Sequence, residues 1–113
     1  MRVLTSISLV LAVAALLAPA AHVLEMVNKL QLDGALWLAV QQHLYRGWGP
    51  LIGAPTEISG LLVNTFLFLR WPARTRARQL WGLAACSYLA MILVFFVFNA
   101  PVNAAVNSWT RET

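Results

Sequence analysis

Two ionisable side chains of this 113-residue sequence have a spacing that suits proton transfer. His22 and Glu25 are three residues apart, so a helix presents both side chains on one face. Asn28 continues that face one turn later. An imidazole that is oriented by a carboxylate can act as a general base. We therefore predict that His22 and Glu25 belong to a catalytic site.

Three more polar side chains extend the candidate site. Glu57 interrupts an apolar run, where a carboxylate is costly and is expected to have a purpose, such as storing a proton. Asn99 and Asn103 are four residues apart and can donate amide hydrogen bonds to a developing oxyanion. Pro101 lies between them and predicts a break or kink after Asn99, with a short helix following.

A metal site is an alternative use of the same residues. By number and type, two imidazoles and two carboxylates are enough to bind zinc or non-haem iron. The sequence offers them as His22, His43, Glu25 and Glu57. Two histidines on separate elements are more often unrelated polar groups, however, so we predict neither a metal nor a cofactor. The single cysteine, Cys86, excludes an internal disulfide and is expected to be an inert buried thiol.

The composition indicates the kind of element that must position these side chains. Apolar residues make up 60% of the chain and charged residues 11%, whereas soluble domains contain about 25% charged residues. The mean hydropathy is +0.71. A net charge of +4 from few, localised basic residues does not fit a nucleic-acid-binding protein. We predict a small integral membrane protein.

Three uncharged or nearly uncharged runs are each long enough to cross a bilayer as a helix, which takes about 20 residues. A more polar segment lies between the first two and predicts an amphipathic interfacial helix, or two short helices hinged at Asp33–Gly34. We therefore predict one all-α domain, 1–113, in the form of a transmembrane helical bundle. Its expected spans are 3–24, 49–70 and 80–98, and the amphipathic segment is 26–46.

The second loop determines the expected orientation. It carries four of the eight basic residues and no acid, and such loops stay in the cytoplasm. These residues are Arg70, Arg74, Arg76 and Arg78. The N-terminus is then cytoplasmic, and the C-terminus lies outside the plasma membrane, the inner membrane of a bacterium. This orientation places the catalytic candidates at the outer face, beneath Gln41, Gln42, His43 and Tyr45 of the amphipathic segment.

The first run has a second interpretation. Arg2, an apolar stretch and the small residues 18–21 resemble a signal peptide with a cleavage site. The run is 22 residues long, which exceeds the usual apolar region of about 7–15 residues, so we favour a retained span.

Three strings carry a resemblance to a known family: HVLEMVNKL, VQQHLYRGWGP and FNAPVNAAVNSWT. They resemble the anthrone oxygenase-like family of small integral membrane proteins, whose bacterial members mostly have no known function. The resemblance runs from His22 to Trp109 and implies a four-helix membrane bundle. It also implies oxidation of anthrones to anthraquinones by molecular oxygen without metal or flavin. His22, Asn99, Asn103 and Trp109 match the family's polar motif positions.

The sequence departs from the family pattern after Trp109, where a linker and a fourth membrane helix are expected. A truncated or three-span form would leave an apolar groove for a second copy of the chain or another membrane protein; membrane lipid is the other expected partner, and no nucleic acid is expected. On this basis we predict a cofactor-independent oxygenase-like protein acting on an aromatic or quinol-type lipophilic molecule. The alternatives are a non-catalytic accessory membrane subunit and, with less support, a proton-coupled exporter.

Overall fold

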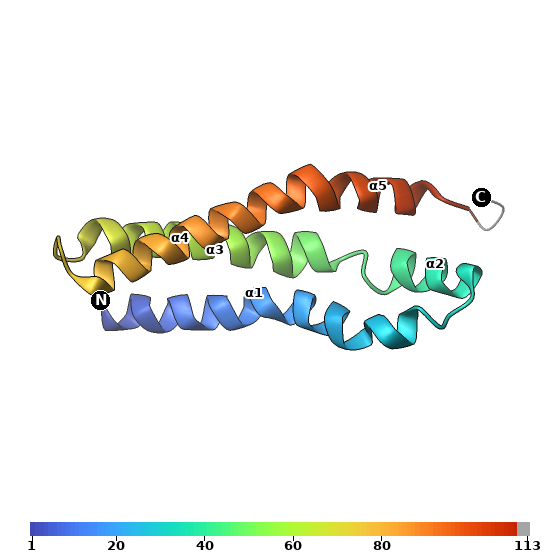
Figure 1. The fold of residues 1–113 in the computed structure, drawn as a ribbon, viewed down its shortest axis with the longest axis horizontal. Coiled ribbons are helices and arrows are strands. Elements are labelled where there is room, and N and C mark those ends of the chain that lie inside the picture. The colour runs from blue at the N-terminus through green and yellow to red at the C-terminus, as the bar shows by residue number, and fades with distance from the viewer. Residues whose placement is uncertain (111–113) are drawn as a thin grey trace.

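The computed structural model describes residues 1–110, and 85% of the structure is helical. Four continuous helical segments follow one another, and no strand occurs within residues 1–110 (Figure 1). The all-α prediction is therefore confirmed. The elements are α1 (Arg2–Lys29), α2 (Gly34–His43), the π-helical turn η1 (Gly49–Gly53) with α3 (Ala54–Arg70), and α4 (Arg76–Val94) with the π-helical turn η2 (Phe95–Asn99) and α5 (Ala100–Ser108).

Three helices are long and apolar enough to cross a membrane. Large apolar side chains cover their outer surfaces; Leu24, for example, is 80% exposed. A helix that is apolar on all sides is stable in lipid but not in water, so these helices indicate a membrane protein. The first helix also continues through Pro19 without a break. The helices are Arg2–Lys29, Gly49–Arg70 and Arg76–Ser108, each at least as long as the predicted span.

Helix α3 packs against both α1 and α4. Two glycines allow α3 and α4 to approach closely. The Tyr88 ring lies against Gly60, where any Cβ atom would collide with it. In the reverse direction, Phe68 of α3 lies against Gly82 of α4, where a Cβ atom would be 3.0 Å from Cδ2 of the ring. Small residues at such contacts are typical of helix packing in membranes.

A buried polar contact joins α1 to α3. Ser8 Oγ donates a hydrogen bond to Asn64 Oδ1 at 3.0 Å, and Asn64 Nδ2 donates to the Gly60 carbonyl at 2.7 Å. Asn64 is 1% exposed, and Leu67, one turn further along, is fully buried. Because both polar atoms of the Asn64 amide have partners, this contact holds helices together and leaves no group free for chemistry.

The two ends of the molecule differ. The N-terminus and the α3–α4 turn lie at one end, and α2 and α5 lie at the other (Figure 1). The longest dimension is 58 Å, compared with about 40–45 Å for a bilayer including its headgroups. The structure is thus longer than a bilayer is thick. Residues 111–113, the C-terminal end that was predicted to lie outside, are not among the residues that the structure describes.

The segment 26–46 is not a single helix: the chain starts a new helix at Asp33–Gly34, where the sequence offered a hinge as the alternative. The first residues of this segment belong to α1, which ends at Lys29, and α2 starts only at Gly34. Asp33 Oδ1 accepts a hydrogen bond from Leu36 N at 2.8 Å and so caps α2. Helix α2 runs along the long axis, nearly in line with α3, and not across it (Figure 1). An interfacial position of α2 stays a prediction.

The helix does not break at Pro101, since one continuous helical stretch runs from Arg76 to Ser108. The chain instead forms the wide turn η2, in which Ala100 N donates to Phe95 O, five residues back. The prediction of a short helix that starts after Asn99, with Pro101 in its first turn, is confirmed by α5. The widened turn accommodates a residue that has no N–H to donate to the usual carbonyl four residues earlier. The turn η1 likewise comes just before a proline: Ala54 N donates to Gly49 O, five residues back, and Pro55 lies in the first turn of α3.

Candidate functional site

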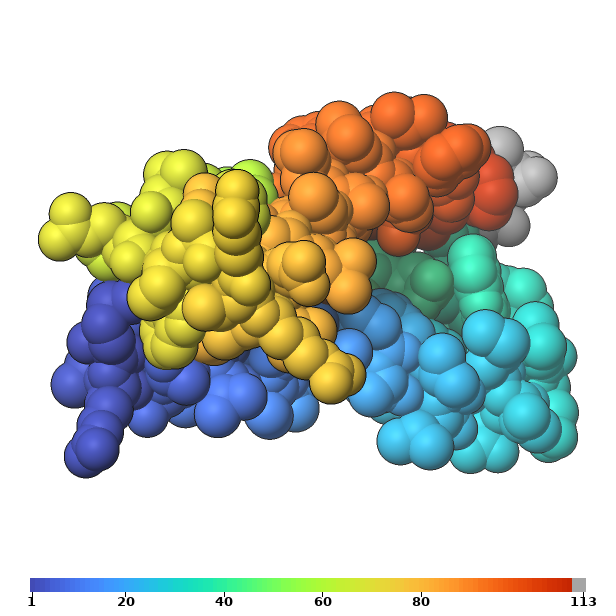
Figure 2. All heavy atoms as spheres, turned by 60° about the vertical axis from the view of Figure 1, so that its left-hand side comes forward, coloured from blue at the N-terminus to red at the C-terminus, as the bar shows by residue number. Residues whose placement is uncertain are grey.

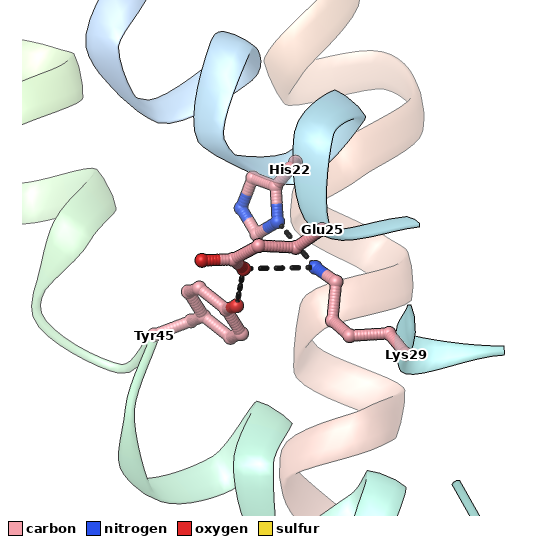
Figure 3. Close-up of polar contacts among 4 residues, drawn as sticks. All are labelled: His22, Glu25, Lys29 and Tyr45. Carbon is pink, nitrogen blue, oxygen red and sulfur yellow. Dashed lines mark hydrogen bonds and ion pairs between the residues drawn. The ribbon is translucent and has the colours of Figure 1, made fainter. Parts of the chain in front are cut away.

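The side chains with the most mutual contacts lie where the end of α1 meets the segment after α2 (Figure 3). His22, Glu25 and Lys29 are three and four residues apart, so α1 presents them on one face. The chain after α2 turns back and brings Tyr45 and Trp48 onto that face. We call these five residues the His22 cluster.

A hydrogen bond between Lys29 and His22 defines the state of the imidazole. Lys29 Nζ lies 2.9 Å from His22 Nδ1 (Figure 3). An ammonium group has only donors, so Lys29 donates and Nδ1 accepts with its lone pair. The ring is then neutral, with its proton on Nε2.

Glu25 links the lysine to a phenol. Its Oε2 accepts a hydrogen bond from Tyr45 Oη and lies 3.8 Å from Lys29 Nζ (Figure 3). The hydrogen bond to this carboxylate is the main reason that the pKa of Tyr45 rises from 10.0 to about 12, with desolvation and the charge of Glu25 adding to it. Tyr45 therefore stays a protonated donor at neutral pH. The cluster thus contains a base, two proton donors and a carboxylate that orients both donors.

Aromatic rings form one wall of the cluster. The His22 ring centroid lies 4.6 Å from that of Tyr45 and 5.6 Å from that of Trp48. Tyr45 and Trp48 meet edge to face at 4.8 Å, and Lys29 Nζ lies 4.6 Å from the centre of the Tyr45 ring. All five side chains are half-buried or partly buried. These contacts hold the His22 imidazole against the rings of Tyr45 and Trp48.

The other predicted site residues lie apart from the His22 cluster. Asn99 and Asn103 are exposed on the α4–α5 helix, and no hydrogen bond to either side chain occurs within residues 1–110. Glu57 is partly buried in the first turn of α3, and in the same range its carboxylate has no hydrogen bond or ion pair. His43 is exposed, and its Nδ1 contacts only the Ala39 carbonyl, at 2.9 Å. Of the predicted catalytic set, only His22 and Glu25 share a cluster.

The geometry does not assemble the alternative metal site. In the described part of the chain, no three His, Cys, Asp or Glu side chains lie together as metal ligands would. His22 and Glu25 are together, but their nearest ionisable partners are an ammonium and a phenol. Cys86 is exposed on α4, not buried as predicted.

The sequence prediction did not include Lys29, although its spacing from Glu25 is the usual i, i+4 ion-pair spacing. Lys29 was interpreted as part of the polar face of the amphipathic segment. Because α1 continues to Lys29, the Lys29 side chain lies beside His22. Tyr45 and Trp48 follow α2 in an irregular segment, and no periodicity predicts where such a segment leads.

Comparisons with protein-family models, with curated proteins and with solved structures gave no match. The function is therefore inferred from the chemistry of the His22 cluster.

Proposed function

We propose that this chain is a small helical membrane protein that oxidises a lipophilic aromatic or quinol-type molecule without a cofactor, in the manner of the anthrone oxygenase-like family. The observation that carries the proposal is the contact of Lys29 Nζ with His22 Nδ1, beside Glu25 and Tyr45. It puts a basic lone pair and a positive charge at one point, next to aromatic rings.

The proposed reaction starts with a proton transfer. A substrate hydroxyl or activated C–H group enters between the two nitrogens and gives its proton to His22 Nδ1. The ammonium of Lys29, released from Nδ1, then pairs with the oxyanion that forms on the substrate. Charge stabilisation of this kind is usually the largest single contribution to catalysis. Glu25 keeps Lys29 in place, and the neutral Tyr45 donates to Glu25.

The second stage consumes molecular oxygen. The deprotonated carbon gives electrons to O2 and forms a C–O bond, and the hydroperoxide then loses water. Overall, one CH2 group and one O2 molecule give one C=O group and one water. A quinol would instead give two electrons and two protons to O2, forming a quinone and hydrogen peroxide, so no other oxidant is required in either case. In this scheme Lys29 stabilises the oxyanion, the part that the sequence assigned to hydrogen bonds from Asn99 and Asn103. The part of Asn99, Asn103 and Glu57 in catalysis stays a prediction.

The proposed location is the inner membrane of a bacterium, with the N-terminus and the arginine-rich α3–α4 turn in the cytoplasm. The absence of acids and the four arginines of that turn support this orientation. The His22 cluster then lies near the outer headgroups, where a lipophilic molecule can enter from the bilayer.

The two histidines of the chain provide a matched test. We would measure oxygen consumption by the full chain in lipid nanodiscs with anthrone and with a quinol. General-base catalysis contributes about 100-fold or more, so His22→Gln should lose at least that factor, while His43→Gln stays close to the wild type. Equal rates for the two variants would contradict the proposal.

A non-catalytic accessory subunit is the second candidate, and the Ser8–Asn64 contact favours it. This contact shows that buried polar groups here can serve helix packing alone. On this view the His22 cluster also only fastens the end of α1 to the segment after α2. No oxygen consumption by the folded wild-type chain, together with a loss of helix packing in His22→Gln, would favour this candidate.

A further inference from the structure

The end of the molecule opposite the His22 cluster carries an uncompensated positive charge. We call Arg70, Arg74, Arg76 and Arg78 the arginine turn. The turn lies beside the N-terminal residues of α1, which add Arg2 and the terminal amine (Figures 1 and 2). Within residues 1–110 the acids are Glu25, Asp33 and Glu57, and Glu57 is in the first turn of α3, at the other end of that helix.

The start of α4 increases this positive charge. The N-terminus of a helix carries a partial positive charge, and acids usually occupy its first turn. Here that turn contains Arg76 and Arg78 and no acid. Within residues 1–110 the N-terminus of α4 is capped by Thr75, whose Oγ1 accepts from Arg78 N at 3.2 Å. Like charges therefore accumulate at this point, and an external anion would relieve their repulsion.

Two of the four arginines lie over aromatic rings: Arg70 Cζ is 5.8 Å from the centre of the Phe66 ring, whereas Arg78 is held more closely. Its Cζ lies 4.8 Å from the centre of the Phe68 ring, and that ring is itself fixed against Gly82. Arg78 is partly buried, whereas the other three arginines are exposed. A guanidinium has five N–H donors, and no hydrogen bond to this one occurs within residues 1–110.

Two tryptophans place the arginine turn at headgroup level. The rings of Trp71, which follows Arg70, and Trp81, one turn after Arg78, lie 5.8 Å apart. Tryptophan is enriched where the hydrocarbon of a membrane meets its headgroups. At that depth the anions available in quantity are lipid phosphates.

We propose that the arginine turn binds the headgroup phosphate of an anionic phospholipid, with Arg78 as the fixed contact. Phe68 holds the guanidinium in a binding orientation, so the phosphate can take two of its N–H donors without first ordering the side chain. The exposed arginines add attraction at longer range. This proposal does not depend on the function of the His22 cluster.

The test is lipid selection by the full chain in mild detergent, measured by native mass spectrometry with equal amounts of phosphatidylglycerol and phosphatidylcholine. The wild type should retain phosphatidylglycerol preferentially. Arg78→Gln should lower this preference by about fivefold or more, since one basic side chain near an anionic surface contributes about that factor and the fixed contact is lost as well. Arg76→Gln, with the same charge change on an exposed side chain, loses only this general attraction and should lower the preference by about fivefold at most, and by less than Arg78→Gln does.

Phe68→Leu is the second variant, because it releases Arg78 without changing any charge. It should lower the preference more than Arg76→Gln does, with the helix content unchanged by circular dichroism. Equal effects of Arg78→Gln and Arg76→Gln would overturn Arg78 as the fixed contact, because the lipid preference would then follow from the total positive charge alone. Complete displacement of phosphatidylglycerol by inorganic phosphate would overturn the lipid as the occupant, and so would an equal uptake of the two lipids by the wild type.

Discussion

Lys29 donates a hydrogen bond to Nδ1 of His22, about two helical turns earlier on α1, with 2.9 Å between the two nitrogens. The contact uses the lone pair that a general base needs. It also places a fixed positive charge where a deprotonated substrate would carry its negative charge. Binding of a substrate hydroxyl between the two nitrogens would therefore exchange one set of hydrogen bonds for another without leaving either nitrogen unpaired.

The two histidines are expected to be opposite tautomers at neutral pH. His22 accepts at Nδ1 from Lys29 and so has its proton on Nε2, whereas His43 Nδ1 faces the Ala39 carbonyl and must carry a proton to bond with it. Nitrogen-15 NMR of histidine-labelled protein separates the two forms. In Lys29→Met, only the His22 signals should change. Equal populations of both tautomers at His22 in the wild type would contradict the assignment.

Tyr45 should titrate late. We expect its phenol to ionise at about pH 12, while its unfolded value is 10.0, because the Glu25 carboxylate holds the proton. The folded state therefore binds this proton more tightly than the unfolded state does. Its contribution to stability is complete below pH 10 and is lost between pH 10 and about 12.

Ultraviolet absorbance of the phenolate measures this titration. The chain has only two tyrosines, so Tyr45→Phe identifies the signal of Tyr45. Glu25→Gln should move the pKa of Tyr45 downward, because the charged acceptor is removed. An unchanged titration in Glu25→Gln would show that the hydrogen bond is not the cause.

Substitution of Gly60 tests the packing of α3 on α4. A methyl group at Gly60 meets the Tyr88 ring directly, so Gly60→Ala should destabilise the fold by about 1–3 kcal/mol, the usual cost of overpacking. Gly34→Ala is the control, because the space around Gly34 is open and alanine favours a helix. Thermal unfolding in detergent compares them. A stability of Gly60→Ala equal to that of the wild type would contradict the close approach.

Neighbouring glutamines on α2 should behave differently. Gln42 Nε2 donates to the carbonyls of Val106 at 2.9 Å and Trp109 at 2.8 Å, which closes the end of α5. Gln41 Oε1 is buried and has no partner within residues 1–110. Gln42→Leu should cost about 1 kcal/mol or more and raise hydrogen exchange near Val106, while Gln41→Leu should be neutral or stabilising. The opposite order of the two variants would rule out this tether.

Cys86 provides a test of the membrane environment. Its thiol is exposed on α4, among the apolar side chains of the third long helix. If lipid surrounds this helix, a charged maleimide should not label Cys86 in intact membranes but should do so after solubilisation in sodium dodecyl sulfate. Rapid labelling in intact membranes would show that water reaches this surface.

Uncharged runs predicted the three long helices because the length and composition of a span are local properties. Helix ends were harder to predict. The polar residues Asn28 and Lys29 after Glu25 suggested a new element, yet α1 continues to Lys29, since two polar residues within one turn do not stop a helix. The start of α2 is marked by Asp33, a capping residue, and by Gly34, a poor helix former.

The site was predictable only in its local part. The spacing of His22 and Glu25 determines that they share a face, whatever surrounds them. The expected orientation already placed Tyr45 above His22 and Glu25, but its contact with Glu25 depends on how an irregular segment folds back after α2, which no repeating pattern encodes. For Asn99 and Asn103 the spacing predicted a shared face, but not that this face would point away from the other helices.

The wide turn at Phe95–Asn99 makes the last helix sensitive to chain length. Without one residue of this turn, the helix could return to ordinary α-helical hydrogen bonding, and everything after it would rotate by about 100° around its axis. Val106 would then face away from Gln42, and the tether between α2 and α5 would be lost. A single-residue deletion here would thus preserve the length and apolarity of the span while disconnecting it from its neighbour. Insertions and deletions, more than substitutions, should be poorly tolerated at this point.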